Sequence, residues 1–144
     1  ERIVTTAGLV GAGRLAERLA VQYANDRKVF GGKPISAYQG LQFPLAQSHA
    51  ELQCARLMNL NAAALCDRGQ PYGTEANIAK LIGSQAATHA IEHGMQAMGG
   101  MGYAREFHME RLWRDARLFK FAPVSEEMIL NYIAIHDLGM PKSY

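Results

Sequence analysis

The hydrophobic residues of this chain recur every three to five positions over long stretches, which is the pattern of one buried face of an α-helix. The first stripe predicts a long helix over about residues 2–29, before Gly31 and Gly32 interrupt it. No segment alternates apolar and polar residues for long enough to predict a β-strand. The pattern therefore predicts an all-α domain.

A second apolar stripe follows, and Pro44 leaves the start of its helix open. Either the helix begins near Phe43 with the proline in its first turn, or it begins near Ser36 and is kinked, because proline lacks an N–H and clashes with the preceding turn. After a polar turn, Thr74 is the expected N-cap of a third helix that runs to about Met98.

Two shorter helices are expected after the third one. The first spans about residues 108–119. Ser125 is the expected N-cap of the last helix, with Glu126 and Glu127 in its first turn, where acidic side chains meet the positive end of the helix dipole. Three long helices and two shorter ones with brief connections predict an antiparallel helical bundle.

The composition fits one globular domain. Hydrophobic residues make up 49% of the 144 residues and charged residues 19%, which is enough to bury a core. The net charge of +2 is too balanced to indicate a nucleic-acid or polybasic membrane surface, and no apolar run is long enough for a transmembrane helix. Cys54 and Cys66 are expected to be reduced thiols packed in the interior, which favours a cytoplasmic location.

Two local motifs carry little chemistry by themselves. The glycines of residues 99–102 follow a predicted helix rather than a strand, so they are not a dinucleotide fingerprint, and a helix stop is their simpler interpretation. His89 and His93 share one helix face, but no third ligand accompanies them, so we expect no metal site. Taken alone, the residues indicate a helical bundle with one glycine-rich corner.

Four motifs follow one another along the chain. They are Arg27-x-x-Phe30-Gly31 with Pro34, Ile35 and Gln39; Ala79-Lys80; Gln96-x-x-Gly99-Gly100-x-Gly102-Tyr103; and Glu110-Arg111-x-x-Arg114-Asp115-Ala116-Arg117. In this order they resemble the C-terminal helical domain of the acyl-CoA dehydrogenases, and the resemblance covers residues 1–144. It implies that the N-terminal helical and middle β domains of the family are missing here, and that this chain alone is inactive.

The resemblance implies an FAD enzyme that desaturates an acyl-CoA thioester between its α and β carbons and passes electrons to an electron-transfer flavoprotein. It also implies self-association into a dimer or tetramer. Residues that would meet the adenosine diphosphate half of FAD, across a boundary between copies, are Arg27, Phe30, Gln39, Gln96, Gly99 and Gly100. Ser125 would take the place of a flavin-contacting Thr, with Glu127 close by. A guanidinium suits a pyrophosphate, and bare glycine backbone allows its close approach.

The catalytic base departs from a common pattern of the family. Many members carry it in a Tyr-Glu-Gly-Thr motif before the last helix, where this chain reads Ala122-Pro123-Val124-Ser125, and proline cannot accept a proton. A subgroup similar to the isovaleryl- and long-chain-type enzymes carries its Glu in a Glu-Arg pair at the start of the first helix. Glu1 and Arg2 fit that pattern, so we predict Glu1 as the base and Arg2 as part of the acyl-CoA pocket.

Two alternatives stay open at this point. Because Pro123 stands where the usual base is found, the chain could belong to a relative with the same bundle that catalyses a different flavin reaction or no reaction. A non-enzymatic helical module used for assembly predicts instead that Arg27, Gln39, Gln96 and Gly100 do not converge on one pocket.

Overall fold

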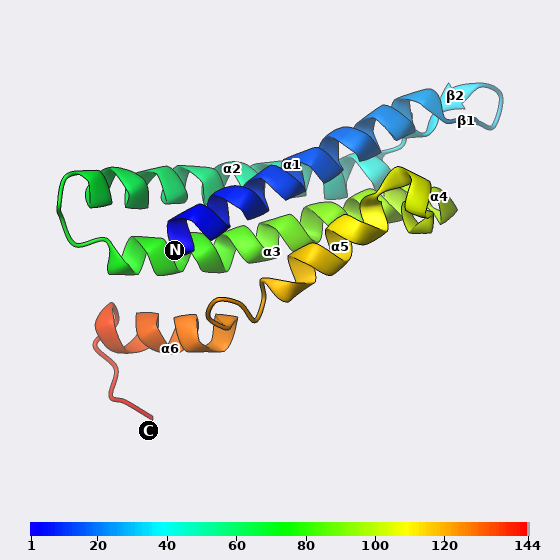
Figure 1. Cartoon of the computed structure of the whole chain (residues 1–144). Coiled ribbons are helices and arrows are strands. Elements are labelled where there is room, and N and C mark those ends of the chain that lie inside the picture. The colour runs from blue at the N-terminus through cyan, green and yellow to red at the C-terminus, as the bar shows by residue number, and fades with distance from the viewer. Residues whose placement is uncertain (144) are drawn as a thin grey trace.

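Three long helices form the framework of the molecule: α1 (Arg2–Asp26), α2 (Gln39–Asp67) and α3 (Gly73–Met98). The computed structural model describes residues 1–143. Helix α2 runs antiparallel to its two neighbours, whereas α1 and α3 point in the same direction (Figure 1). Helix α3 contacts both other long helices and also α5 and α6, so it is the centre of the bundle. The all-α bundle predicted from the periodicity is confirmed.

Helices α1 and α3 approach closely because small residues line their contact. A Cβ atom on Gly83 would lie 2.7 Å from Cγ2 of Thr6, and one on Gly13 would lie 3.2 Å from Cα of Ala87. Such a short separation is possible only where the facing residues are small. The buried apolar side chains form two clusters beside this contact: Ala16, Ile91, Met98, Met109, Leu112 and Ala116; and Val10, Leu52, Ala55, Ala86 and Ala90.

Helix α1 ends earlier than predicted, and a small hairpin follows it. Strands β1 (Lys28–Val29) and β2 (Lys33–Pro34) pair antiparallel. At the turn between them, Phe30 has φ 42° and Gly31 has φ 83°. The expectation of no strand is therefore wrong at this place, because two-residue strands are too short to show an alternating pattern.

Helix α2 begins at Gln39, between its two predicted starts. A 3-10 turn, η1 (Ile35–Ala37), precedes it. Pro44 lies inside the helix, in its second turn, where the missing N–H leaves the carbonyl of Gly40 without its helical donor. A start near Phe43 or near Ser36 is thus wrong by a few residues in opposite directions.

The predicted cap of α3 is wrong, whereas its end is right. The helix begins at Gly73, and Tyr72 occupies the capping position without a side-chain cap bond, so Thr74 lies inside the first turn. Gly73 is pressed against α6, since a Cβ atom there would lie 2.7 Å from the hydroxyl of Tyr132. The helix ends at Met98, as the glycine corner indicated.

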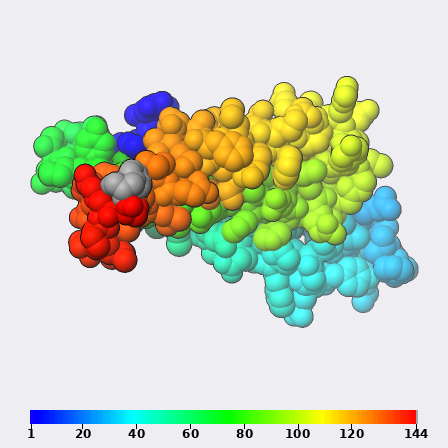
Figure 2. All heavy atoms as spheres, turned by 90° about the horizontal axis from the view of Figure 1, so that it is seen from below, coloured from blue at the N-terminus to red at the C-terminus, as the bar shows by residue number. Residues whose placement is uncertain are grey.

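The C-terminal third of the chain folds back along α3. It contains α4 (Gly100–Tyr103), the 3-10 turn η2 (Arg105–Phe107), α5 (Met109–Leu118) and α6 (Glu126–His136). Ser125 caps α6 as predicted, because its Oγ accepts a hydrogen bond from the backbone N–H of Met128 at 3.3 Å. Figure 2 shows α5 and α6 covering one side of the bundle.

Both cysteines lie on α2, and both are exposed free thiols. The prediction that Cys54 and Cys66 pack in the interior is therefore wrong, because they fall on the outer face of the helix. Within residues 1–143, none of the helices combines the length and the apolar character that a membrane crossing requires.

A substitution at the glycine corner tests the packing of α4 against α3. A Cβ atom on Gly102 would lie 2.6 Å from the carbonyl oxygen of Met95, so Gly102→Ala is expected to lower the free energy of unfolding by about 1–3 kcal/mol. Gly11→Ala is the control: nothing lies within 4 Å there, and alanine in a helix interior is expected to raise stability by about 0.5–1 kcal/mol. Urea unfolding measures both changes, and equal effects would contradict this packing.

Candidate functional site

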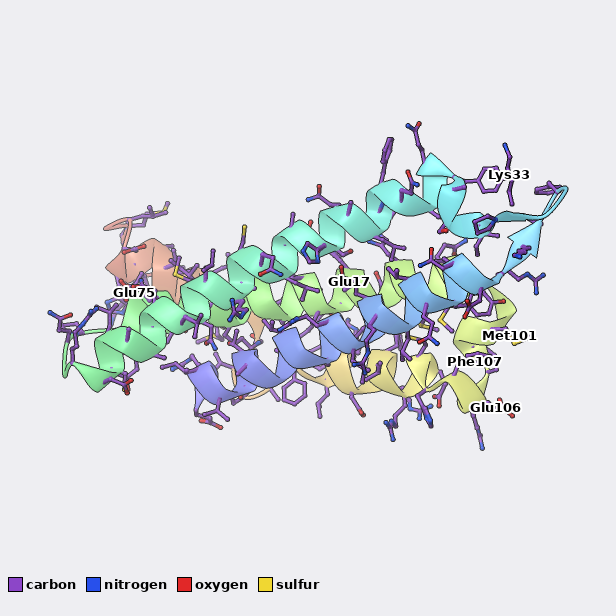
Figure 3. All side chains as sticks on the ribbon, turned by 90° about the horizontal axis from the view of Figure 1, so that it is seen from above. Glu17, Lys33, Glu75, Met101, Glu106 and Phe107 are labelled. Carbon is purple, nitrogen blue, oxygen red and sulfur yellow. The ribbon has the colours of Figure 1, made fainter. Side chains whose placement is uncertain are left out.

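The six residues predicted to meet a nucleotide all belong to one end of the bundle. The end of α1, the β1–β2 hairpin, the beginning of α2 and the end of α3 with α4 come together there (Figure 1). Figure 3 places Met101 and Phe107 at the same end as Lys33 of the hairpin, with Glu75 at the opposite end of the molecule. All six are exposed: Arg27, Phe30, Gln39, Gln96, Gly99 and Gly100.

Arg27, the residue that directly follows α1, lines a cavity of about 440 Å³. Met98 and Met101 line the same cavity. Gly99 and Gly100 lie between these two methionines in the sequence but do not themselves line it. Of the six predicted residues, Arg27 is therefore the one on this cavity, where its guanidinium can offer charge-assisted hydrogen bonds to a phosphate group.

The backbone at Gly99 explains why a glycine stands at this corner. Its φ of 59° and ψ of −134° are strained for any residue with a side chain. Its N–H donates to the carbonyl of Gln96 at 3.2 Å, and its own carbonyl accepts from the N–H of Gly102 at 2.9 Å. No atom lies within 4 Å of a Cβ placed on Gly99 or Gly100, so this backbone surface is open to a ligand.

The other predicted contacts share the end of the bundle but not the cavity. Phe30 lies at the tip of the hairpin with 88% of its surface exposed, and Gln39 is the first residue of α2. Neither of them, nor Gln96, lines the cavity beside Arg27. The chain by itself gathers the six predicted residues at one end of the bundle and leaves these three side chains open to the outside.

A second group of predicted residues lies where α1 begins. Arg2 lines a cavity of about 300 Å³ together with Asn77, Val124 and Met128. The Nε atom of Arg2 is buried and has no hydrogen-bond partner among residues 1–143. Glu1 is exposed, and its carbonyl accepts the N–H of Thr5 at 3.0 Å as the helix begins.

The two places at which the family resemblance puts a catalytic base adjoin one cavity. Arg2 directly follows Glu1, Val124 directly follows Pro123, and Arg2 and Val124 line the same cavity. The beginning of α1 and the segment before α6 therefore meet at this place.

The beginning of α6 carries a fixed negative charge. The hydrogen bond from the backbone N–H of Glu127, together with that from the Ser125 side chain, lowers the pKa of the Glu127 carboxyl below its ordinary value. Nearby Lys120 and Lys80 act in the same direction. Because Ser125 also caps the helix through Met128, its hydroxyl is held in one place at the edge of this second group.

Lys80 belongs to one of the four sequence motifs, but it is not among the predicted site residues. It is fully buried, and its Nζ donates to the carbonyls of Phe119 at 2.7 Å and Val124 at 2.8 Å. Burial lowers the pKa of its ammonium, and the negative charge of Glu126 opposes that shift. The signal in the sequence is a lysine on the apolar face of a helix, next to Ala79, where a buried cation requires partners.

The two groups of residues are far apart on one chain. Lys80 holds Val124 beside the second group, and α3 continues for 18 residues from Lys80 to Met98 at the glycine corner. At 1.5 Å per residue this is about 27 Å along the helix axis. The two groups are therefore presented at well-separated places along α3.

Comparison with known proteins gives a consistent result. Residues 1–136 match the family described as acyl-CoA dehydrogenase, C-terminal domain. The chain is 44% identical over its whole length to the acyl-CoA dehydrogenase FadE12 of Mycobacterium tuberculosis and covers 37% of that protein. It is 39% identical, over 99% of its length, to the mitochondrial short-chain specific acyl-CoA dehydrogenase of Bos taurus, of which it covers 34%.

A solved structure shows the same fold. The glutaryl-coenzyme A dehydrogenase in complex with glutaryl-CoA superimposes with a TM-score of 0.92 at 32% sequence identity, covering 99% of this chain and 36% of that one. The chain thus spans little more than a third of the length of the proteins it matches.

The conformation of the glycine corner can be tested on two neighbouring positions. Gly99→Ala places a side chain at φ 59° and ψ −134° and is expected to cost about 1–3 kcal/mol of unfolding free energy. Gly100→Ala is expected to change it by less than about 0.5 kcal/mol, because α4 starts there and no atom lies within 4 Å. Thermal unfolding distinguishes the two variants. A Gly99→Ala variant with an unchanged unfolding free energy would refute the conformation described.

Proposed function

The chain belongs to the acyl-CoA dehydrogenase family, and we propose that it is the C-terminal helical domain of an FAD-dependent enzyme that desaturates an acyl-CoA thioester between its α and β carbons. The relatives cover further sequence, so we place the N-terminal helical and middle β domains of the family beside it in the working enzyme. Its own contribution is the nucleotide end of the cofactor site, a catalytic carboxylate and a surface for self-association.

One observation carries the cofactor part of this proposal: Arg27 lines one cavity with Met98 and Met101, the two residues that flank Gly99 and Gly100. The guanidinium supplies charge-assisted hydrogen bonds to a pyrophosphate, and the open backbone at Gly99 and Gly100 allows its oxygens to approach. Gln39 and Gln96 are exposed amides at the same end that can orient the nucleotide. FAD, when bound, accepts the hydride that leaves the β carbon of the substrate.

Proton removal falls to Glu1 in this proposal. An exposed carboxylate at the beginning of α1 becomes a useful base when the acyl thioester closes over it and excludes water, because desolvation raises the pKa of a carboxyl group. Arg2, with its buried and unpaired Nε, shapes the acyl-CoA pocket beside it. Ser125 and Glu127 form the edge of the same region at the start of α6 and meet the flavin there.

The separation of the two groups supports a site shared between two copies. About 27 Å of α3 lies between the segment held by Lys80 and the glycine corner. In the proposed assembly, Arg27 and its neighbours serve the cofactor of a second copy, whose Glu1 lies at that cofactor's reacting end. The exposed Phe30 at the hairpin tip also gains a partner in such an assembly.

The remaining partners follow from the family. Electrons leave to an electron-transfer flavoprotein. The similarity to a chain in a structure of the electron transferring flavoprotein of Acidaminococcus fermentans supports this pairing (TM-score 0.92, 30% identity, 95% of this chain and 36% of that chain). The two free thiols fit a reducing compartment such as the cytoplasm.

The nucleotide contact is tested by removing one guanidinium. In the enzyme that carries this domain, Arg27→Ala is expected to weaken FAD affinity by about 10- to 100-fold, because charge-assisted hydrogen bonds to the pyrophosphate are lost. Arg18→Ala on the same helix, which lines a different cavity, is expected to leave FAD affinity unchanged. Flavin fluorescence titration measures both, and normal affinity in Arg27→Ala would refute the assignment.

The catalytic carboxylate has its own test. Glu1→Gln keeps the size of the side chain but cannot accept a proton, so turnover is expected to fall by about 10²- to 10⁴-fold while FAD stays bound. Glu92→Gln, on an exposed position of α3 outside both groups, is expected to retain normal turnover. Flavin bleaching by an acyl-CoA substrate provides the measurement, and undiminished bleaching by Glu1→Gln means that another group is the base.

A further inference from the structure

Among residues 1–143, Lys80 is the most deeply buried ionisable group, and the proposed reaction does not use it. No part of its surface is exposed, although lysine is rarely buried completely. Two of its three N–H donors point to backbone carbonyls rather than to a carboxylate. A cation in such a place is expensive to keep unless its hydrogen bonds serve the structure around it.

The two carbonyls mark the ends of one segment. Phe119 follows the last residue of α5, and Val124 directly precedes Ser125, the cap of α6. By holding both, at 2.7 Å and 2.8 Å, the ammonium group closes the connection between α5 and α6 into a fixed loop over α3. We call residues 119–124 the connecting loop.

A second set of polar contacts, which we call the second tie, lies one helical turn further along α3 and holds the side chain of Glu126. The hydroxyl of Ser84 donates to Oε1 of Glu126 at 2.7 Å, and Nζ of Lys120 lies 3.6 Å from Oε2 of the same carboxylate. The backbone N–H of Glu126 donates to the carbonyl of Lys120 at 3.2 Å. The first turn of α6 is thus fixed by neighbouring residues of α3, at the point where Ser125 and Glu127 begin it.

The charges around Lys80 act in opposite directions on its ammonium group, so Lys80 is not part of a simple ion pair. Glu126 and Glu127 favour its positive charge, whereas Arg2 and Lys120 oppose it. Arg2 is the residue that lines the cavity with Val124. The lysine therefore lies between the acyl-CoA cavity and the connecting loop, and a change in its position is passed on to both.

We propose that Lys80 is a positioning residue, whose buried ammonium fixes the connecting loop. In this position, Ser125 and Glu127 contact the flavin, and Val124 lines the acyl-CoA cavity. The placement of these three residues by Lys80 follows from the contacts, and their use toward flavin and substrate rests on the proposed function. An apolar residue of the same length would fill the space but leave the carbonyls of Phe119 and Val124 without donors.

The first test measures the loop without any cofactor. In Lys80→Met, hydrogen exchange at the amides of Ala122 and Glu126 is expected to become at least tenfold faster, under conditions in which the chain stays folded. Leu52→Ala is the matched control, because it damages the buried contact of α2 with α3 away from the loop. Unchanged exchange in Lys80→Met, or equally fast exchange in Leu52→Ala, would overturn the positioning role.

A milder variant covers the case in which Lys80→Met does not fold. Ser84→Ala removes only the hydrogen bond to Glu126 and leaves the lysine in place. The amide of Glu126 is then expected to exchange several-fold faster, while the amide of Ala122, which donates to the carbonyl of Leu118, keeps its rate. Equal rates in Ser84→Ala and the unmodified chain would count against the second tie and with it against the fixed loop.

The second test uses the FAD-loaded enzyme. Lys80→Met is expected to shift the visible absorption band of the flavin and to lower kcat at least tenfold, with a smaller change in KM, whereas Leu52→Ala changes none of these. If the unmodified enzyme binds no flavin, the proposed function fails, but the exchange experiment still decides whether Lys80 fixes the loop. If flavin binds and its spectrum and kcat are the same in Lys80→Met, the loop does not position the flavin contacts and the inference is wrong.

Discussion

The unbroken length of α3 is the constraint on which the rest of this structure depends. A helix is stiff, and 26 residues of it set fixed distances between the things attached along its surface. Lys80 near its start holds the connection between α5 and α6, and the glycine corner stands at its end. The two groups of predicted site residues are therefore presented at two places that cannot move toward each other.

Small residues make this central position possible. Gly83 and Gly94 allow α1 to approach α3, and Gly102 allows α4 to lie on the last turns of the same helix. Larger side chains would push the neighbours away and shift Arg27 relative to the glycine corner. In the same way, the buried hydrogen bonds of Lys80 and Ser84 fix the connecting loop and the first turn of α6. Helix packing thus sets the position of Arg27 relative to the glycine corner, and buried polar contacts set the position of the connecting loop.

Sequence reasoning succeeded where a local rule decides the structure. Ser125 with two acidic residues after it is a local capping pattern, and the apolar period fixed the long helices. It failed where contacts distant in sequence decide: Gly73 begins α3 because it packs against Tyr132, so Thr74 is not a cap. The hairpin after α1 is too short to show a period, and Cys54 and Cys66 lie on a face that the chain leaves open.

The candidate site also has one part that the sequence predicted and one part that only the structure revealed. The motifs around Arg27 and Gly99 predicted one shared site, and both residues lie at the same end of the bundle, where Arg27, Met98 and Met101 line one cavity. Lys80 appeared only as part of a motif, because nothing in a sequence shows that two carbonyls some 40 residues away need a donor. That Glu1 and Pro123 belong to one region also required coordinates, since 122 positions separate them in the sequence.

The most direct measurement of the central claim, that one cofactor site takes residues from two copies, is complementation between two variants of the enzyme, assayed at an FAD concentration that loads the normal site but not the weakened one. Glu1→Gln and Arg27→Ala are produced together so that they form mixed assemblies. If the site is shared, each mixed pair contains one intact site, and random pairing restores about one quarter of the normal turnover. If Glu1 and Arg27 serve the same cofactor within one chain, no intact site can form, and activity that stays at the level of the separate variants would contradict the account.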